Sequence, residues 1–194
     1  MKSVYATQAT LSDFLARLDA SFARPGRLYL IGESTQVFEG WRPWSSQIEF
    51  TARVAQQDRA DFSLIVENLQ REHAVVVVEE SPEQLIPLPE GYEERARPAS
   101  GELTHLELFH FDPYSVAFRF VARGDEPDYH LVLTYLERGW VTLDEMDSLL
   151  ADLLPRMTME TIAQDPAEFR RKYKGMTQMW HAVAPRTTHR ITAY

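Results

Sequence analysis

Two short segments of the sequence carry residues whose types and spacing suit the binding of phosphate and a divalent cation. The first is Gly32-Glu33-Ser34, which directly follows the apolar run 28–31. The second is Gln-Ile-Glu at 47–49, inside a stretch of strand-forming residues. Alternate residues of a strand share one face, so Gln47 and Glu49 are expected to point the same way. A glycine-serine turn can offer backbone and hydroxyl donors to phosphate, and oxygen ligands beside it can hold Mg²⁺.

The acidic residues Glu49 and Glu107 are the candidates for catalysis. Two-metal transfer of a phosphoryl or nucleotidyl group needs carboxylates that hold Mg²⁺ and one that activates the attacking hydroxyl. Glu107 lies in the middle of an expected strand among apolar neighbours, which makes it the candidate for the third carboxylate. Gln47 can supply only a neutral carbonyl oxygen. The predicted metal ligands are therefore Gln47, Glu49 and Glu107, and the predicted catalytic residues are Glu49 and Glu107.

Positive charge near these segments comes from Arg119 and Arg123, which could offset charge on a leaving phosphate. Together with Gly32 and Ser34 they form the predicted nucleotide-binding set. Each residue also has a simpler structural interpretation. Ser34 suits the N-cap of a helix after an ordinary turn, and Glu49 suits the solvent side of an edge strand.

The spacing of apolar residues predicts the elements that position these side chains. A helix is expected from Leu11 to Phe22, begun by a capping box of Thr10 and Asp13. The strand expected at 74–78 is rich in valine, which is typical of a strand buried on both faces. The other expected elements are strands at 27–31, 47–52 and 103–111, and helices at 34–40, 62–73, 112–124, 127–138, 143–153 and 165–176.

Further expectations concern helix ends and connections. Asp112 and Asp128 are expected to cap helices, and Thr142 with Glu145 forms a further capping box. Prolines make the segment 81–101 an irregular connection, and 185–194 is expected to be a polar tail. The pattern predicts an α+β protein with a core at 1–112 and a helical subdomain at 113–194.

The composition limits the classes of function. The 194-residue chain has no cysteine, which excludes disulfides and thiolate metal sites, and its formal net charge is −9. Such a charge disfavours broad nucleic-acid binding, although the basic cluster 170–174 leaves a local contact open. No apolar run reaches membrane-spanning length, so we expect a cytoplasmic protein with no membrane partner.

The remaining candidate residues are aromatic or imidazole side chains. Trp41, Trp44 and Trp180 could stack on a base or on a partner side chain, or could pack in the core. The six histidines show no pair with zinc-ligand spacing. His105 and His110 are therefore interpreted as structural residues.

Several stretches together resemble a family of largely uncharacterised bacterial proteins with the nucleotidyltransferase fold. The resemblance runs from about Leu28 to Lys172. It rests on the strand followed by Gly-x-Ser, on 81–95, on His-Phe-Asp-Pro-Tyr at 110–114 and on Asp-Pro-Ala-Glu-Phe-Arg-Arg at 165–171. It implies a nucleotidyltransferase-like mixed β-sheet flanked by helices, a helical C-terminal part, and a nucleoside triphosphate with Mg²⁺ as ligands.

The chain departs from the pattern of that fold at the positions where chemistry would occur. Glu33 replaces a small residue of the turn and would repel phosphate. Gln47 stands where the wider fold has the first acid of Asp-x-Asp or Asp-x-Glu. Phe120 stands where this group usually has a lysine, which leaves Arg119 as the nearest cation.

The leading hypothesis is a nucleotidyltransferase-like protein with an atypical or degenerate metal site that binds nucleotide with weak or no transfer. The alternative is a non-catalytic interaction module, such as one component of a bacterial toxin-antitoxin pair whose protein partner is encoded nearby. A third hypothesis is an active enzyme that uses Glu33 and Glu49 as metal ligands.

Overall fold

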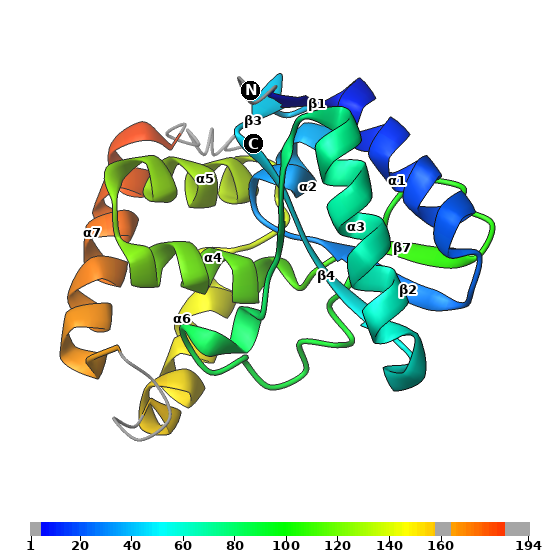
Figure 1. Ribbon diagram of the computed structural model, residues 1–194. Helices are drawn as coiled ribbons and strands as arrows, with labels where there is room; N and C mark the ends of the chain where they lie inside the picture. The colour runs from blue at the N-terminus through cyan, green and yellow to red at the C-terminus, as the bar shows by residue number, and fades with distance from the viewer. Residues whose placement is uncertain (1–4, 158–163, 185–194) are drawn as a thin grey trace, which may run out of the picture.

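A central five-stranded sheet organises the protein in a computed structural model that describes residues 5–157 and 164–184 (Figure 1). The strand order is β5-β4-β2-β7-β6. These strands are β2 (Gly26–Leu30), β4 (Gln47–Val54), β5 (Val76–Glu79), β6 (Arg97–Pro98) and β7 (Leu106–His110). A separate two-stranded sheet pairs β1 (Ala6–Thr7) with β3 (Trp44–Ser45).

The sheet contains both parallel and antiparallel pairs. β2 runs antiparallel to β4 and parallel to β7, while β5 is parallel to β4 and β6 is antiparallel to β7. This confirms the predicted α+β class with a mixed sheet flanked by helices. The prediction that 74–78 is buried on both faces was wrong, because β5 lies at the edge of the sheet and Val76 is 39% exposed.

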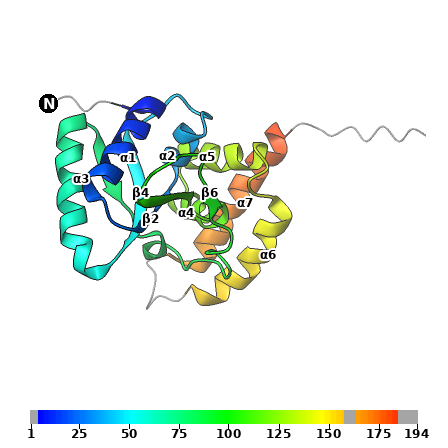
Figure 2. The same cartoon turned by 90° about the vertical axis from the view of Figure 1, so that its right-hand side faces the viewer.

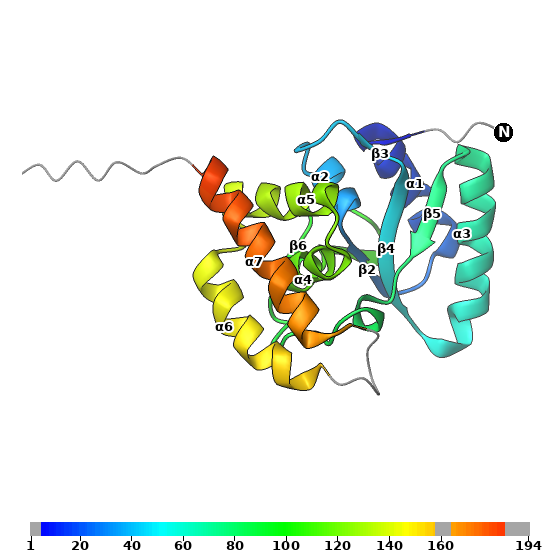
Figure 3. The ribbon, with the colours of Figure 1, turned by 90° about the vertical axis from the view of Figure 1, so that its left-hand side faces the viewer.

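Helices cover the two faces of the sheet (Figures 2 and 3). On one face, α1 (Gln8–Phe22) and α3 (Arg59–His73) pack side by side over a core that includes Ile48 and Phe50 of β4. The other core includes Tyr29 of β2 and Ile31, which directly follows β2. It is formed with the helices α4 (Pro113–Arg123), α5 (Glu126–Glu137), α6 (Leu143–Leu153) and α7 (Pro166–Val183).

The proposed boundary between 1–112 and 113–194 stays a prediction, because residues from both parts share one of the two cores. Tyr29, Ile31 and Phe111 from the first part pack with α4–α7 from the second. Lys172 of α7 also donates from Nζ to the carbonyl of Ala122 at the end of α4, at 2.6 Å. The expected polar tail at 185–194 lies outside the described residues.

Capping side chains fix several helix ends as the sequence indicates. Asp112 accepts hydrogen bonds from the N–H groups of Tyr114 and Ser115, and Thr142 accepts one from Glu145. The predicted start of the first helix was wrong. Thr7 is its N-cap, because its Oγ1 accepts from the N–H of Thr10, so α1 begins at Gln8.

A buried aspartate of α1 holds the beginning of β7. The carboxylate of Asp19 accepts hydrogen bonds from the backbone N–H groups of Thr104, His105 and Leu106 at 2.8 to 2.9 Å. Burial raises the pKa of Asp19, but the three backbone donors outweigh it and hold the pKa below its ordinary value. This contact joins residues more than eighty positions apart in the chain.

Candidate functional site

The turn between β2 and α2 (Glu33–Phe38) depends on glycine at position 32. Gly32 has φ +60° and ψ −126°, a conformation that side chains with a Cβ rarely adopt. A Cβ added there would lie 2.7 Å from Oε2 of Glu49 and 3.1 Å from Cζ of Phe120. The turn and the face of β4 that bears Glu49 therefore meet, and side chains of the protein fill the space between them.

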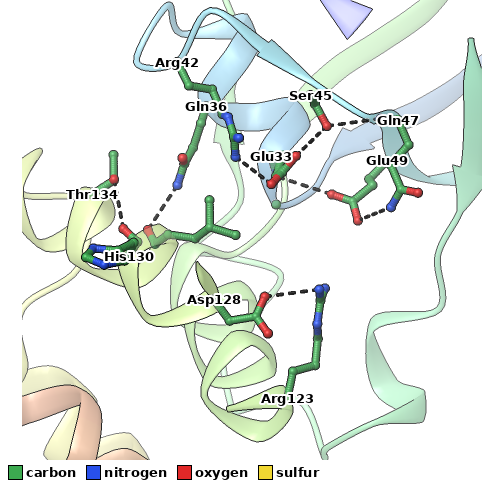
Figure 4. Close-up of polar contacts among 12 residues, drawn as sticks. Glu33, Gln36, Arg42, Ser45, Gln47, Glu49, Arg123, Asp128, His130 and Thr134 are labelled. Carbon is green, nitrogen blue, oxygen red and sulfur yellow. Dashed lines mark hydrogen bonds and ion pairs between the residues drawn. The ribbon is translucent and has the colours of Figure 1, made fainter. Parts of the chain in front are cut away.

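Glu49 uses both of its carboxylate oxygens inside the protein (Figure 4). Oε2 accepts a hydrogen bond from the N–H of Glu33 at 3.3 Å, and Oε1 accepts one from Nε2 of Gln47 at 2.9 Å. The backbone N–H of Glu49 donates to Oγ of Ser34 at 2.7 Å. The turn and the strand are thus joined by direct contacts of the residues predicted to hold phosphate and metal.

Burial dominates the electrostatics of Glu49, whose residue is 6% exposed. Burial raises the pKa of the Glu49 carboxyl, the nearby charges of Glu80 and Glu33 raise it further, and the bonds from Gln47 and the Glu33 N–H oppose the rise. Both neighbouring acids are engaged elsewhere. Glu33 pairs with Arg42 at 2.6 Å and accepts from Oγ of Ser45 at 2.6 Å, and Glu80 pairs with Arg119.

The predicted phosphate-binding arginines both make ion pairs within the chain. Arg119 bonds to Glu80 at 2.5 Å, and Arg123 bonds to Oδ1 of Asp128 at 3.1 Å. Asp128 is buried, and burial raises its pKa. The expectation that Asp128 caps a helix was wrong, because the N-cap of α5 is Asp125. Among the described atoms, Oδ2 of Asp128 has no hydrogen-bond partner.

The structure does not bring Glu107 to the other candidate residues. Glu107 is paired in register with Arg27 at the far end of β2, whereas the carbonyl of Glu49 accepts from the N–H of Ile31. Four residue steps along β2 correspond to roughly 13 Å. Glu107 is exposed, and its carboxylate bonds to Nε of Arg27 at 2.6 Å. Glu107 therefore lies too far from Glu49 to act as the third carboxylate of the same site.

The side chains of Gln47 and Glu49, as they are placed, do not fit a bound divalent cation. A magnesium ion needs oxygen ligands with free lone pairs in near-octahedral positions. Each Glu49 oxygen already uses one of its two lone pairs in a hydrogen bond, and the amide of Gln47 presents its nitrogen, not its oxygen, toward Glu49. Within residues 5–157 and 164–184, no cluster of three or more His, Asp or Glu side chains is placed to hold a metal ion.

A cleft of about 560 Å³ lies beside the turn. Trp41, Arg42 and Trp44 line one wall, and His130 and Thr134 of α5 lie on the opposite side. The two sides are joined by a hydrogen bond in which Nε2 of Gln36, labelled in Figure 4, donates to the carbonyl of Leu131 at 3.0 Å. Glu33 also lines the cleft, whereas Gln47 and Glu49 do not. The cleft is thus adjacent to the predicted metal site but separate from it.

Of the three candidate tryptophans, Trp41 and Trp180 pack against the core, while Trp44 is 42% exposed. His110 is buried between Oγ1 of Thr35 at 3.3 Å and Oε1 of Glu39 at 2.8 Å, in keeping with a structural role.

Sequence reasoning did not identify three residues that shape this region. Ser45 and Arg42 hold Glu33, and the hydroxyl of Tyr135 donates to the carbonyl of Gly32 at 3.4 Å. Burial raises the pKa of Tyr135, which keeps it a neutral donor. Ser45 stands just before the Gln-Ile-Glu strand and could have been noticed. Tyr135 lies 103 positions from Gly32, and no local pattern indicates that contact.

Comparison with protein-family models, curated proteins and solved structures gave no match. The nucleotidyltransferase resemblance therefore remains an expectation drawn from the sequence. Within the part of the chain that the structure describes, no helix combines the length and apolar character needed to cross a bilayer.

Proposed function

We propose that this protein is a nucleotidyltransferase-like binding module that does not transfer nucleotides. One observation carries the proposal: the carboxylate of Glu49 accepts a hydrogen bond from the N–H of Glu33, at the turn where the resemblance would place a phosphate. In this proposal the carboxylate of Glu49 takes the place of the phosphate of a bound nucleotide.

Charge supports the same conclusion. A phosphate at the turn would compete with Glu49 for the same donor and would lie close to the carboxylates of Glu49 and Glu33. The negative charges of a phosphate and a neighbouring carboxylate repel each other strongly where water is excluded. Phe120, which contacts the space above Gly32, adds apolar bulk where the related group has a lysine.

Isothermal titration with ATP, CTP, GTP and UTP, each with and without Mg²⁺, tests the proposal. We expect no saturable Mg²⁺-dependent binding and no transfer of label from any of the four triphosphates to protein or RNA. Inorganic tripolyphosphate at matched ionic strength is the control for nonspecific charge effects. Saturable binding that requires Mg²⁺, together with label incorporated into an acceptor, would contradict the proposal.

A protein partner encoded nearby, as in toxin-antitoxin pairs, is a second candidate for what the module binds. The observation that favours it is an exposed aromatic pair beside the cleft. Tyr5 and Trp44 are 57% and 42% exposed, and their ring centroids are 4.3 Å apart. Exposed tryptophan and tyrosine are enriched at the centres of protein interfaces.

Co-expression with the product of each adjacent gene, followed by size-exclusion chromatography, tests this second candidate. A stable complex should form with one product and should be weakened by Trp44→Ala. Leu64→Ala is the matched control, because Leu64 is an exposed apolar residue of α3, 56% exposed and outside the cleft lining. Equal weakening by both variants, or no complex with either neighbour, would contradict this candidate.

A further inference from the structure

The cleft between the segment 41–44 and α5 has the size of a small-ligand site. Its volume of about 560 Å³ falls within the usual range for such sites. Gln36 and Leu131 also line the cleft, and the side chain of Gln36 is already hydrogen-bonded to the carbonyl of Leu131. The charged and aromatic lining residues are therefore considered as contacts for a ligand.

The charged groups of this cleft are mainly acidic. Its lining contains the carboxylates of Glu33 and Glu126 and the guanidinium of Arg42. Arg42 is bonded to Glu33 at 2.6 Å, so its charge is already balanced within the protein. Glu126 is exposed at the first turn of α5 and has no ion-pair partner among the described residues. The lining residues thus carry one net negative charge when His130 is neutral, and Arg138 adds a positive charge outside the lining, beside Trp41. The unpaired carboxylate of Glu126 disfavours an anionic ligand at its end of the cleft and favours a cationic one.

The aromatic residues of the cleft suit a planar cation. Trp41 and Trp44 both line it, and each indole already has a guanidinium of the protein over its ring. The Cζ atom of Arg138 lies 5.7 Å from the Trp41 centroid, and that of Arg42 lies 5.9 Å from the Trp44 centroid. A guanidinium is less strongly hydrated than an ammonium and stacks on aromatic rings. It therefore gains more binding free energy than an ammonium does from contact with tryptophan side chains.

We infer that this cleft binds a guanidinium group, with Glu126 supplying the opposing charge and the wall of Trp41 and Trp44 supplying the packing surface. The group could belong to a small guanidine or to an arginine side chain of a peptide. The inference does not depend on the proposed lack of nucleotide transfer, because Gln47 and Glu49 are not part of the cleft lining.

Titration followed by NMR and tryptophan fluorescence tests the inference on the intact chain. The probes are N-acetyl-arginine amide, the isosteric N-acetyl-citrulline amide, which lacks the charge, and N-acetyl-lysine amide. We expect saturable binding of the arginine probe, weaker binding of the lysine probe, and binding of the citrulline probe at least about tenfold weaker than that of arginine. Binding should weaken as salt is raised. An equal affinity for arginine and citrulline, or no saturable binding of any probe, would overturn the inference.

Two substitutions on α5 form a matched pair for the same titration. Glu126→Gln removes the unpaired carboxylate of the cleft and should weaken arginine binding by about threefold. Glu137→Gln removes an exposed carboxylate at the other end of α5, outside the lining, and should leave binding unchanged. Equal effects of the two substitutions would count against the cleft as the binding site.

The source of the guanidinium is distinguished by a third set of probes. Agmatine represents a free small molecule, and the blocked tripeptide Ala-Arg-Ala represents an arginine within a peptide. Tighter binding of the tripeptide than of agmatine would assign the site to a peptide, and the reverse order would assign it to a small guanidine. If ATP bound at the cleft more tightly than the arginine probe did, the charge argument would fail.

Discussion

Oε2 of Glu49 accepts a hydrogen bond from the backbone N–H of Glu33 across the turn after β2, at 3.3 Å. The bond places a carboxylate of β4 over the glycine-serine turn. Two opposing effects act on this carboxylate, and burial is the larger. Burial disfavours the charged form of Glu49, while the donors at Gln47 and Glu33 favour it.

The first prediction concerns the pH dependence of stability at Glu49. Because the pKa of Glu49 is raised in the folded protein, its contribution to the free energy of unfolding is greatest below its ordinary pKa and falls as pH rises through the raised pKa. Glu49→Gln, whose amide can still pair with Gln47, should therefore be more stable than the wild type at pH 7. The difference should shrink as pH falls toward the ordinary glutamate pKa.

Urea unfolding of both proteins across this pH range measures the difference. Glu107→Gln is the control, because Glu107 is exposed and bonded only to exposed Arg27. Its effect should stay within about 0.5 kcal/mol at every pH. A Glu49→Gln variant less stable than the wild type at pH 7 would show that the hydrogen bonds outweigh burial.

The second prediction concerns restoration of an acidic pair on β4. Gln47→Asp replaces the donor to Oε1 of Glu49 with a second carboxylate beside it. The loss of the bond and the new repulsion should lower the free energy of unfolding by about 1–3 kcal/mol.

Thermal unfolding with and without millimolar Mg²⁺ checks the outcome, with Gln47→Asn as the uncharged control. We expect Mg²⁺ to leave the wild type and the control unchanged. If Gln47→Asp alone gains stability with Mg²⁺, a single substitution restores a metal site. If the wild type gains as much, the proposal of a non-catalytic module is wrong.

The third prediction compares two glycines with positive φ. Gly32→Ala should cost about 3 kcal/mol, because the new Cβ would be strained and would lie 2.7 Å from Oε2 of Glu49. Gly40→Ala should cost only about 1 kcal/mol, because its φ of +70° is strained but no atom lies within 4 Å of the new Cβ. Chemical unfolding measures both, and equal costs would show that contact with Glu49 contributes nothing.

The fourth prediction concerns Asp19, which holds the start of β7. Asp19→Asn retains an acceptor but loses the charge and one of the oxygens that bind three N–H groups, so it should cost about 2 kcal/mol at neutral pH. Because the pKa of Asp19 is lowered on folding, this contribution is present above its ordinary value of 3.8 and is lost as pH falls through the lowered pKa.

Unfolding at pH 7 and at pH 3 measures this change. The gap between wild type and Asp19→Asn should narrow at the lower pH. Asp152→Asn is the control, because Asp152 is an exposed acid of α6. A gap that does not change with pH would show that the carboxylate charge has no part in holding β7.

The sequence by itself determined the elements with strong local signals. The positions of several helices were correctly predicted from Asp112 before a proline, from the capping box of Thr142 and Glu145, and from the apolar spacing of the long helices. These signals are local, because caps and periodicity act within one or two helical turns. The paired residues of β4 also followed from strand periodicity, which placed Gln47 and Glu49 on one face. The short strands β1, β3 and β6 have only two residues each and carry no periodicity to detect.

Only the tertiary structure decided what the candidate residues do. Sequence spacing placed Glu107 on a strand, but the register of β7 against β2 set it opposite Arg27, far from Glu49. Asp19 and Tyr135 form their bonds with backbone groups more than eighty positions away. Local patterns describe the backbone of a segment, whereas strand register, helix packing and the balance of burial against hydrogen bonding depend on segments distant in the chain. For that reason the turn at Gly32 and the carboxylate of Glu49 were both recognisable in the sequence, but the hydrogen bond between that carboxylate and the N–H of Glu33 was not.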